Sequence, residues 1–182
     1  PDPLVIVGFD ARYKSRDFAQ DTARVLAAAN VRCTLLPRPL PTPVLAFAVS
    51  HLDAAAGVMV TASHNPRADN GYKVYWRGGA QITAPIDSEI SALIGQTALL
   101  TEAELAAADH DLIEVAGDGL TNAYVDTIAK LVGPDSPRTA RVAYTPLHGV
   151  GCHTLKDTFA AAGFPAPSVV DDQAEPDPDF PT

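Results

Sequence analysis

Short apolar runs and amphipathic stretches alternate along the first 61 residues, and this alternation predicts strands and helices in turn. Apolar, β-branched runs at 4–9 and 57–61 predict two buried strands, and an alternating segment at 31–35 predicts a third. Apolar residues at helical spacing predict helices from about Asp17 to Ala29 and from Val44 to Leu52. This order is that of a right-handed βαβαβ unit, so the three strands should be parallel.

The two helices carry different start sequences. Ser15 is placed to cap the first helix, and the second begins at Thr42-Pro43, where proline suits the first helical position. The first helix is expected to be held by one stripe of residues at helical spacing, namely Phe18, Thr22, Val25, Leu26 and Ala29.

The pattern continues beyond residue 61. A β-like run at 72–76 predicts a fourth strand, and a glycine turn at 77–79 follows it. The elements expected next are a helix with Pro85 near its first position and with Ile86, Ile90, Leu93 and Ile94 facing inward, an alanine-rich helical piece at 105–108, a strand at 112–115 and an amphipathic helix over 124–132.

Residues 133–137, Gly-Pro-Asp-Ser-Pro, interrupt every pattern and are the expected domain boundary. Residues 1–133 would then form an α/β domain. Residues 134–182 would begin a second, similar domain, with a strand at 142–145, a glycine-bearing loop at 146–151, a helix at 152–162 and a strand from 169. The tail at 171–182 is too polar and proline-rich to build a core, so this second domain looks incomplete.

The stretch between the third and fourth strands carries the most chemistry. It reads Thr61-Ala62-Ser63-His64-Asn65-Pro66, and Asn70-Gly71-Tyr72-Lys73 follows after three residues. In open α/β sheets, functional loops lie at the carboxyl ends of strands. A hydroxyl, an imidazole and an amine therefore converge on one loop, and the sequence predicts an active site there.

These residues resemble the phosphoserine loop of the α-D-phosphohexomutases, the phosphoglucomutase/phosphomannomutase family. The segments at 8–12, Gly-Phe-Asp-Ala-Arg, and 145–151, Thr-Pro-Leu-His-Gly-Val-Gly, agree with it. The likeness covers nearly the whole chain and leans towards the branch with phosphopentomutases and glucose-1,6-bisphosphate synthases. It implies an α/β fold of the phosphoglucomutase type, in which a mixed sheet lies in a three-layer α/β/α domain. It also implies an N-terminal fragment, with domain I and the start of domain II.

The charge of the chain limits its partners. The net charge of −9 argues against nucleic acid and against an anionic membrane surface, and no apolar run approaches the ~20 residues of a membrane helix. Two cysteines fit no metal spacing or disulfide framework, which favours a reduced, cytoplasmic protein. A phosphosugar is nevertheless a possible substrate, because six basic residues should flank one crevice: Arg12, Lys14, Arg16, Arg67, Lys73 and Arg77.

The resemblance implies a role for each candidate residue. Ser63 would carry the phosphoryl group, and Lys73 would act as general acid/base beside it. Arg12 would contact the transferring phosphate. The alternative for Ser63 is a turn-stabilising hydroxyl. On the residues alone, His64 could equally be a loop histidine bonded to backbone, whereas the motif favours contact of His64 with the phosphoryl group or proton transfer. Phosphate-binding candidates are completed by Lys14, Arg16 and His148, and the last of these is as well suited to a structural role. Asp10, Asn65 and Asn70 are expected to shape the loops rather than react.

The implied reaction is a phosphoryl exchange between Ser63 and a hexose or pentose phosphate through a bisphosphosugar, with glucose 1,6-bisphosphate as the type of activator. The family's Mg²⁺ binds the serine phosphate and an Asp-x-Asp-x-Asp loop of the second domain, which this chain lacks. Asp177-Pro178-Asp179 does not replace it, because no third ligand follows. We therefore expect the isolated chain to be inactive. Two alternatives remain open: a non-catalytic phosphate- or phosphosugar-binding module and, more weakly, a metal-dependent phosphohydrolase.

Overall fold

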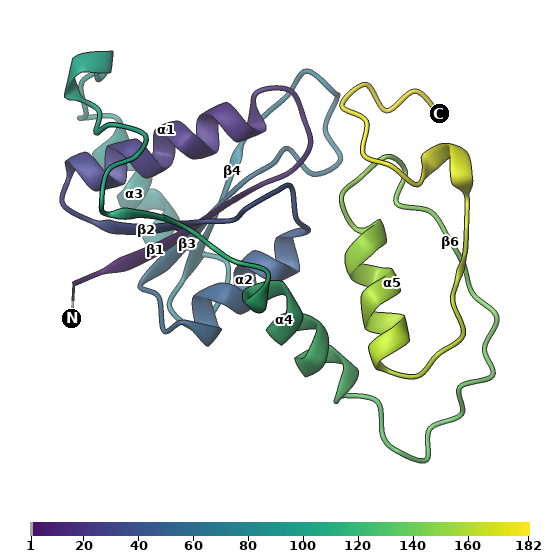
Figure 1. Ribbon diagram of the computed structural model, residues 1–182. Coiled ribbons are helices and arrows are strands. Elements are labelled where there is room, and N and C mark those ends of the chain that lie inside the picture. The colour runs from purple at the N-terminus through teal and green to yellow at the C-terminus, as the bar shows by residue number, and fades with distance from the viewer. Residues whose placement is uncertain (1) are drawn as a thin grey trace.

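The computed structural model describes residues 2–182 and places a five-stranded mixed sheet at the centre of the first part of the chain (Figure 1). The spatial order is β4-β3-β1-β2-β5. The strands are β1 (Leu4–Phe9), β2 (Arg32–Leu35), β3 (Ala56–Val60), β4 (Tyr72–Trp76) and β5 (Ile113–Val115). All neighbours run parallel except β3 and β4, which are antiparallel. The predicted mixed sheet and its parallel core are confirmed.

Helices cover the two faces of this sheet and complete three layers (Figure 1). Helix α1 (Ser15–Ala28) packs on one face, against Val7, Phe9 and their neighbours. Helices α2 (Thr42–His51) and α4 (Gly119–Ala129) lie on the other face, where Ile6, Leu45 and Met59 are almost fully buried. The predicted α/β/α layering is therefore confirmed.

The second part of the chain is a small βαβ unit beside α4. Strands β6 (Ala143–Tyr144) and β7 (Ser168–Val169) pair in parallel, and α5 (Cys152–Ala161) connects them. Helix α5 packs against α4, and Gly163, at a φ of 76°, ends it as predicted. Both cysteines are buried and unbridged, and burial raises the pKa of the Cys33 thiol to about 12.

Two local predictions for the first helix are wrong. The helix begins at Ser15 instead of being capped by it, and its N-cap residue is Lys14 at a left-handed φ of 66°. The predicted stripe is not the packed face, because Phe18 and Val25 are more than a third exposed. The small side chains of Ser15, Ala19, Ala23 and Ala27 are buried instead, which lets the helix lie close to the sheet.

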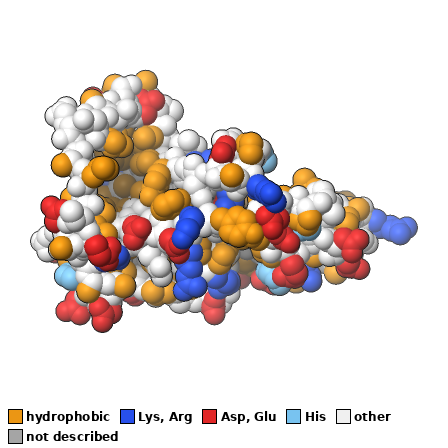
Figure 2. Space-filling view, turned by 90° about the horizontal axis from the view of Figure 1, so that it is seen from above, with side chains coloured by type: hydrophobic (Ala, Val, Ile, Leu, Met, Phe, Trp, Pro, Cys, Tyr) orange, Lys and Arg blue, Asp and Glu red, His pale blue; other side chains and the backbone are white. Residues whose placement is uncertain are grey.

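The segment between β4 and β5 also differs from its prediction. Helix α3 (Ile86–Ile94) forms, but it has no buried residue, and Leu93 and Ile94 are about two-thirds exposed. A 3₁₀ turn at Glu102–Glu104 replaces the helical piece expected at 105–108. Apolar side chains gather around a hollow on this side of the molecule (Figure 2). None of the helices described for residues 2–182 is long and apolar enough to cross a membrane.

The glycine turn after β4 provides a test of the fold. Gly79 has a φ of 81°, and a Cβ there would lie 2.3 Å from the carbonyl oxygen of Ala46. Gly78 has a similar φ of 84° but open space around it. Gly79→Ala should lower the free energy of unfolding by about 2–4 kcal/mol, because strain and a backbone clash add, whereas Gly78→Ala should cost only about 1–2 kcal/mol. Urea unfolding of both variants measures the difference, and equal costs would contradict the close contact with α2.

Candidate functional site

The candidate serine lies where the carboxyl ends of two parallel strands meet. Phe9 of β1 is opposite Val60 of β3, so the loops that follow these strands start side by side. Ser63 is exposed and adopts a left-handed φ of 55°, while its backbone N–H donates to the Thr61 hydroxyl at 3.0 Å. Such a backbone conformation is costly for a residue other than glycine and is typical of functional loops. The sequence 61–73 thus presents the Ser63 hydroxyl outward on a constrained turn.

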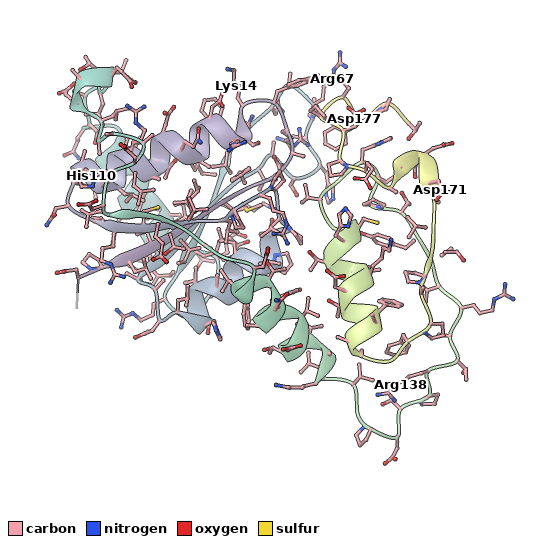
Figure 3. All side chains as sticks on the ribbon, in the orientation of Figure 1. Lys14, Arg67, His110, Arg138, Asp171 and Asp177 are labelled. Atoms are coloured by element: carbon pink, nitrogen blue, oxygen red, sulfur yellow. The ribbon has the colours of Figure 1, made fainter. Side chains whose placement is uncertain are left out.

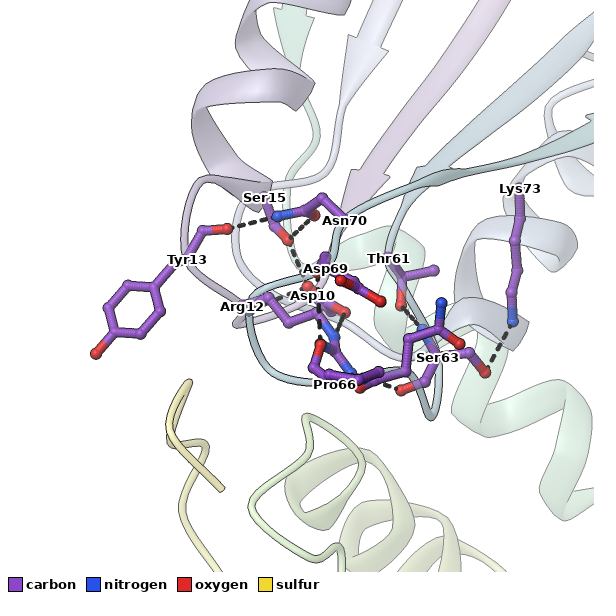
Figure 4. A network of polar contacts seen from close by, with 11 residues as sticks. Asp10, Arg12, Tyr13, Ser15, Thr61, Ser63, Pro66, Asp69, Asn70 and Lys73 are labelled. Carbon is purple, nitrogen blue, oxygen red and sulfur yellow. Dashed lines mark hydrogen bonds and ion pairs between the residues drawn. The ribbon is translucent and has the colours of Figure 1, made fainter. Parts of the chain in front are cut away.

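Lys73 lies beside this hydroxyl. It is on β4, opposite Met59 of β3, and its Nζ donates to Ser63 Oγ at 3.3 Å (Figure 4). Serine and lysine are ten residues apart in the sequence but are brought together because β3 and β4 pair antiparallel. A cation next to a hydroxyl stabilises negative charge that develops on or near the oxygen.

Arg12 has a different environment from the one the resemblance implied. Its side chain is only 3% exposed, and its guanidinium donates to backbone carbonyls of the serine loop (Figure 4). The acceptors are Ser63 at 3.0 Å, Asn65 at 2.8 Å, Pro66 at 2.8 Å and Asp69 at 3.5 Å. The guanidinium therefore fixes the backbone of the serine loop, and its four terminal N–H groups donate to backbone carbonyls.

Asp10 supports this arrangement from the β1 end. Its carboxylate accepts from the Arg12 backbone N–H at 3.0 Å and from the Ser15 hydroxyl at 2.6 Å, and it lies 3.4 Å from Arg12 Nε. The Ser15 hydroxyl also lies 2.9 Å from Asn70 Oδ1, and Asn70 Nδ2 donates to the Tyr13 carbonyl at 2.6 Å. Asp10 and Asn70 shape the loops, in agreement with their expected structural roles. The buried Ser15 hydroxyl belongs to this network instead of capping the helix.

The remaining basic candidates are dispersed. Lys14 Nζ pairs with Asp17 at 2.9 Å, and this contact raises the pKa of the exposed Lys14 ammonium. Arg16 is exposed in the first turn of α1. Arg77 lies at the far end of β4 and lines a cavity of about 730 Å³ with Leu4 and Arg32, at the opposite sheet edge. The expected gathering of six cations in one crevice is therefore wrong.

The two histidines of the motifs differ in burial. His64 is exposed, and its side chain makes no polar contact with residues 2–182. His148 is 5% exposed, and its Nε2 lies 2.7 Å from the Thr182 hydroxyl. His148 also lines a cavity of about 250 Å³ together with Thr61, Ser63 and the glycine loop at 149–151. The second unit thus reaches the serine loop through His148, whose ring is already bonded to the tail.

The C-terminal tail contributes to the site, which the sequence did not predict. Phe180 lines the same cavity, and Asp179 contacts both loops of the first unit. The polar, proline-rich composition of the tail argues against a core, but it says nothing about contacts with another unit. A possible sign was present, since Asp-Pro-Asp fixes two carboxylates on a stiff backbone next to an aromatic residue.

The residues present do not fit a complete metal site. Within residues 2–182, no group of three or more His, Cys, Asp or Glu side chains is arranged to hold an ion. Mg²⁺ requires near-octahedral oxygen ligands, and a phosphate on Ser63 would supply only part of them.

Comparison with known proteins finds two matching family models. "Phosphoglucomutase/phosphomannomutase, alpha/beta/alpha domain I" matches residues 1–100, and the corresponding domain II matches residues 122–182. The interval at 101–121 lies between the matches, and the domain boundary expected at residue 133 stays a prediction.

Several curated proteins and a crystal structure are similar over nearly the whole chain. A protein named probable phosphomannomutase from Haemophilus influenzae is 46% identical over 100% of this chain and 37% of its own length. Human glucose 1,6-bisphosphate synthase is 37% identical over 97% of this chain and 30% of its own length. A protein from Thermus thermophilus, assigned as a phosphomannomutase, superposes with a TM-score of 0.82 at 31% identity, over 98% of this chain and 39% of its own. The chain spans less than two-fifths of the length of each.

Proposed function

The chain belongs to the phosphoglucomutase/phosphomannomutase family, and from that membership and the geometry of the serine loop we propose that it carries the phosphoserine of a phosphosugar mutase. The observation that supports this function most directly is the 3.3 Å contact between Lys73 Nζ and Ser63 Oγ on a strained, exposed turn. Residues 1–133 would form the phosphoserine domain, and residues 134–182 would begin the next.

In the proposed reaction, phospho-Ser63 donates its phosphoryl group to a hydroxyl of a hexose or pentose phosphate. The bond between phosphorus and Ser63 Oγ breaks, and a bond from phosphorus to the sugar oxygen forms. The proton of the attacking hydroxyl leaves that oxygen, and the Ser63 oxygen gains one. The resulting bisphosphosugar then returns its other phosphate to Ser63, so the enzyme regains its starting form. Transfer of this kind depends mainly on positioning and on neutralisation of charge.

The residues of this chain would divide that work. Lys73 is placed to stabilise the charge on Ser63 Oγ and to exchange a proton with the sugar hydroxyl. His64, exposed on the turn, would be free to contact a phosphoryl group. Arg12 would position the loop through its carbonyls, rather than bind phosphate in the arrangement seen here. Lys14 and Arg16 would add positive charge at the rim, and His148 would close the site from the second unit.

The described part of the chain does not supply enough ligands to hold Mg²⁺. The sugar-binding parts and the rest of the metal site would lie in segments outside these residues. We therefore propose that the polypeptide of 182 residues has no mutase activity by itself, although it carries the phosphoryl acceptor.

Intact-protein mass spectrometry with peptide mapping tests the proposal. We expect one added phosphate on the peptide that contains Ser63 in the complete protein. Incubation with a sugar monophosphate that carries an isotopic label in its phosphate should transfer the label to Ser63 of the complete protein and not to Ser63 of this chain alone, since transfer needs the sugar-binding parts. An unmodified Ser63 in an active complete enzyme would overturn the phosphoserine mechanism. Binding of inorganic phosphate without covalent modification would favour a phosphate-binding module.

A further inference from the structure

The C-terminal segment, residues 177–182, passes from the second unit to the two loops of the candidate site (Figure 3). Asp179 contacts both of those loops. Its Oδ2 accepts from the Tyr13 hydroxyl at 3.0 Å, and its Oδ1 accepts from Arg67 at 2.8 Å. Tyr13 belongs to the loop after β1, whereas Arg67 belongs to the serine loop. One carboxylate therefore ties the two loops together, and it also raises the pKa of Tyr13.

Phe180 covers the arginine that organises the serine loop. The centroid of its ring lies 5.0 Å from Cζ of Arg12. The terminal nitrogens of that guanidinium donate to carbonyls of the serine loop, and its Nε is buried without a hydrogen-bond partner. The flat face of the guanidinium is the part left to the aromatic ring, which lies over it as in a cation–π contact. Phe180 has a left-handed φ of 47°, a conformation that a bulky residue adopts only when its surroundings require it.

The same segment also contacts the glycine loop of the second unit. The Asp177 N–H donates to the His148 carbonyl at 3.0 Å, and the Thr182 hydroxyl lies 2.7 Å from His148 Nε2. Gln173 Nε2 donates to the same hydroxyl at 3.0 Å. The segment is thus fixed to the second unit on one side and to the serine loop on the other.

We propose that Asp179 and Phe180 are positioning residues of the serine loop, which hold Arg12 and thereby the Ser63 turn in the geometry that phosphoryl transfer needs. They touch neither Ser63 Oγ nor Lys73 Nζ among the contacts described, so they act through Arg12, Tyr13 and Arg67. The catalytic part of this inference rests on the proposed function, whereas the structural part does not.

Amide hydrogen exchange on this chain tests the structural part. Phe180→Ala should speed exchange of the amides at 62–70 by about five- to tenfold, because the loss of one cation–π contact loosens the loop. Phe180→Trp, which keeps an aromatic face, should restore protection, and Phe180→Leu should not. Phe164→Ala is the matched control, since Phe164 lies 5.8 Å from Cζ of Arg138 in the second unit, away from the serine loop. It should leave the exchange at 62–70 unchanged.

Steady-state kinetics of the complete protein test the catalytic part. We expect Phe180→Ala and Asp179→Asn to lower kcat by about 10-fold or more while KM stays within twofold, because the loop is displaced and the sugar contacts are not. Rescue of kcat by Phe180→Trp would separate positioning from general destabilisation. Unchanged loop exchange in Phe180→Ala would overturn the inference even if Ser63 is phosphorylated. If Ser63 is unphosphorylated but the amides at 62–70 exchange more slowly in the wild type than in Phe180→Ala, only the proposed function would be overturned.

Discussion

Replacing Ser63 by alanine is expected to lower the mutase activity of the complete protein by at least about 10⁴-fold, the scale seen when an enzyme loses its nucleophile. The variant has no oxygen to carry the phosphoryl group, and Lys73 then has no hydroxyl to contact. The fold should not change, because Ser63 is exposed and its side chain bonds only Lys73 among residues 2–182. A coupled assay of phosphosugar isomerisation measures the loss.

Ser88→Ala is the matched control for that measurement. Ser88 is an exposed serine on α3, and within the described residues 2–182 its hydroxyl hydrogen-bonds only to Asp87. Its replacement should leave activity within twofold. If Ser63→Ala retained more than about one-tenth of the activity, another residue would have to carry the phosphoryl group.

Replacing Arg12 by alanine should produce the largest loss of stability. The change leaves the Asp10 carboxylate without its ion-pair partner and several loop carbonyls without donors, so we expect the free energy of unfolding to fall by about 3–5 kcal/mol. Arg12→Lys should recover only part of this loss, since an ammonium cannot reach carbonyls along two edges. Urea unfolding followed by circular dichroism provides the measurement.

Arg67→Ala is the comparison for Arg12. Arg67 is also an arginine of the site, but its ion pair with Asp179 is exposed, at 64% and 47% for the two side chains. Exposed pairs contribute about 0–1 kcal/mol, so this variant should differ little from the wild type in stability. Similar losses for Arg12→Ala and Arg67→Ala would show that the burial of Arg12 does not determine the stability of the loop.

The sequence predicted the sheet and the place of the serine loop because both depend on local patterns. The apolar run that ends at Val60 and the polar, glycine-containing segment after it indicated a buried strand and a functional loop. The pairing of Ser63 with Lys73 was also predictable, since a short loop between two β-runs brings its ends together.

Contacts between distant parts of the chain were harder to predict from the sequence. The packed face of α1 consists of small residues. The prediction of this face relied on large apolar side chains, and it therefore included Phe18 and Val25, which are exposed. Arg12 could be assigned to the site, but its partners are carbonyl oxygens, which every residue possesses and no sequence pattern marks. The position of the tail depends on contacts of Asp179 with Tyr13 and Arg67, which are more than 100 residues away in the sequence.

The antiparallel pairing of β3 with β4 has a consequence for how this loop can vary. The Thr61 N–H donates to the Gly71 carbonyl at 2.9 Å, which closes the loop at its base. Lys73 is held in register by the strand below that closure, opposite Met59. An insertion at the exposed tip, around Arg67 and Ala68, would therefore lengthen the loop without moving the lysine along the sheet. A single-residue deletion within β4 would turn the lysine to the opposite face, away from the serine. The position of the lysine is thus insensitive to changes in length at the tip and sensitive to changes in length within the strand.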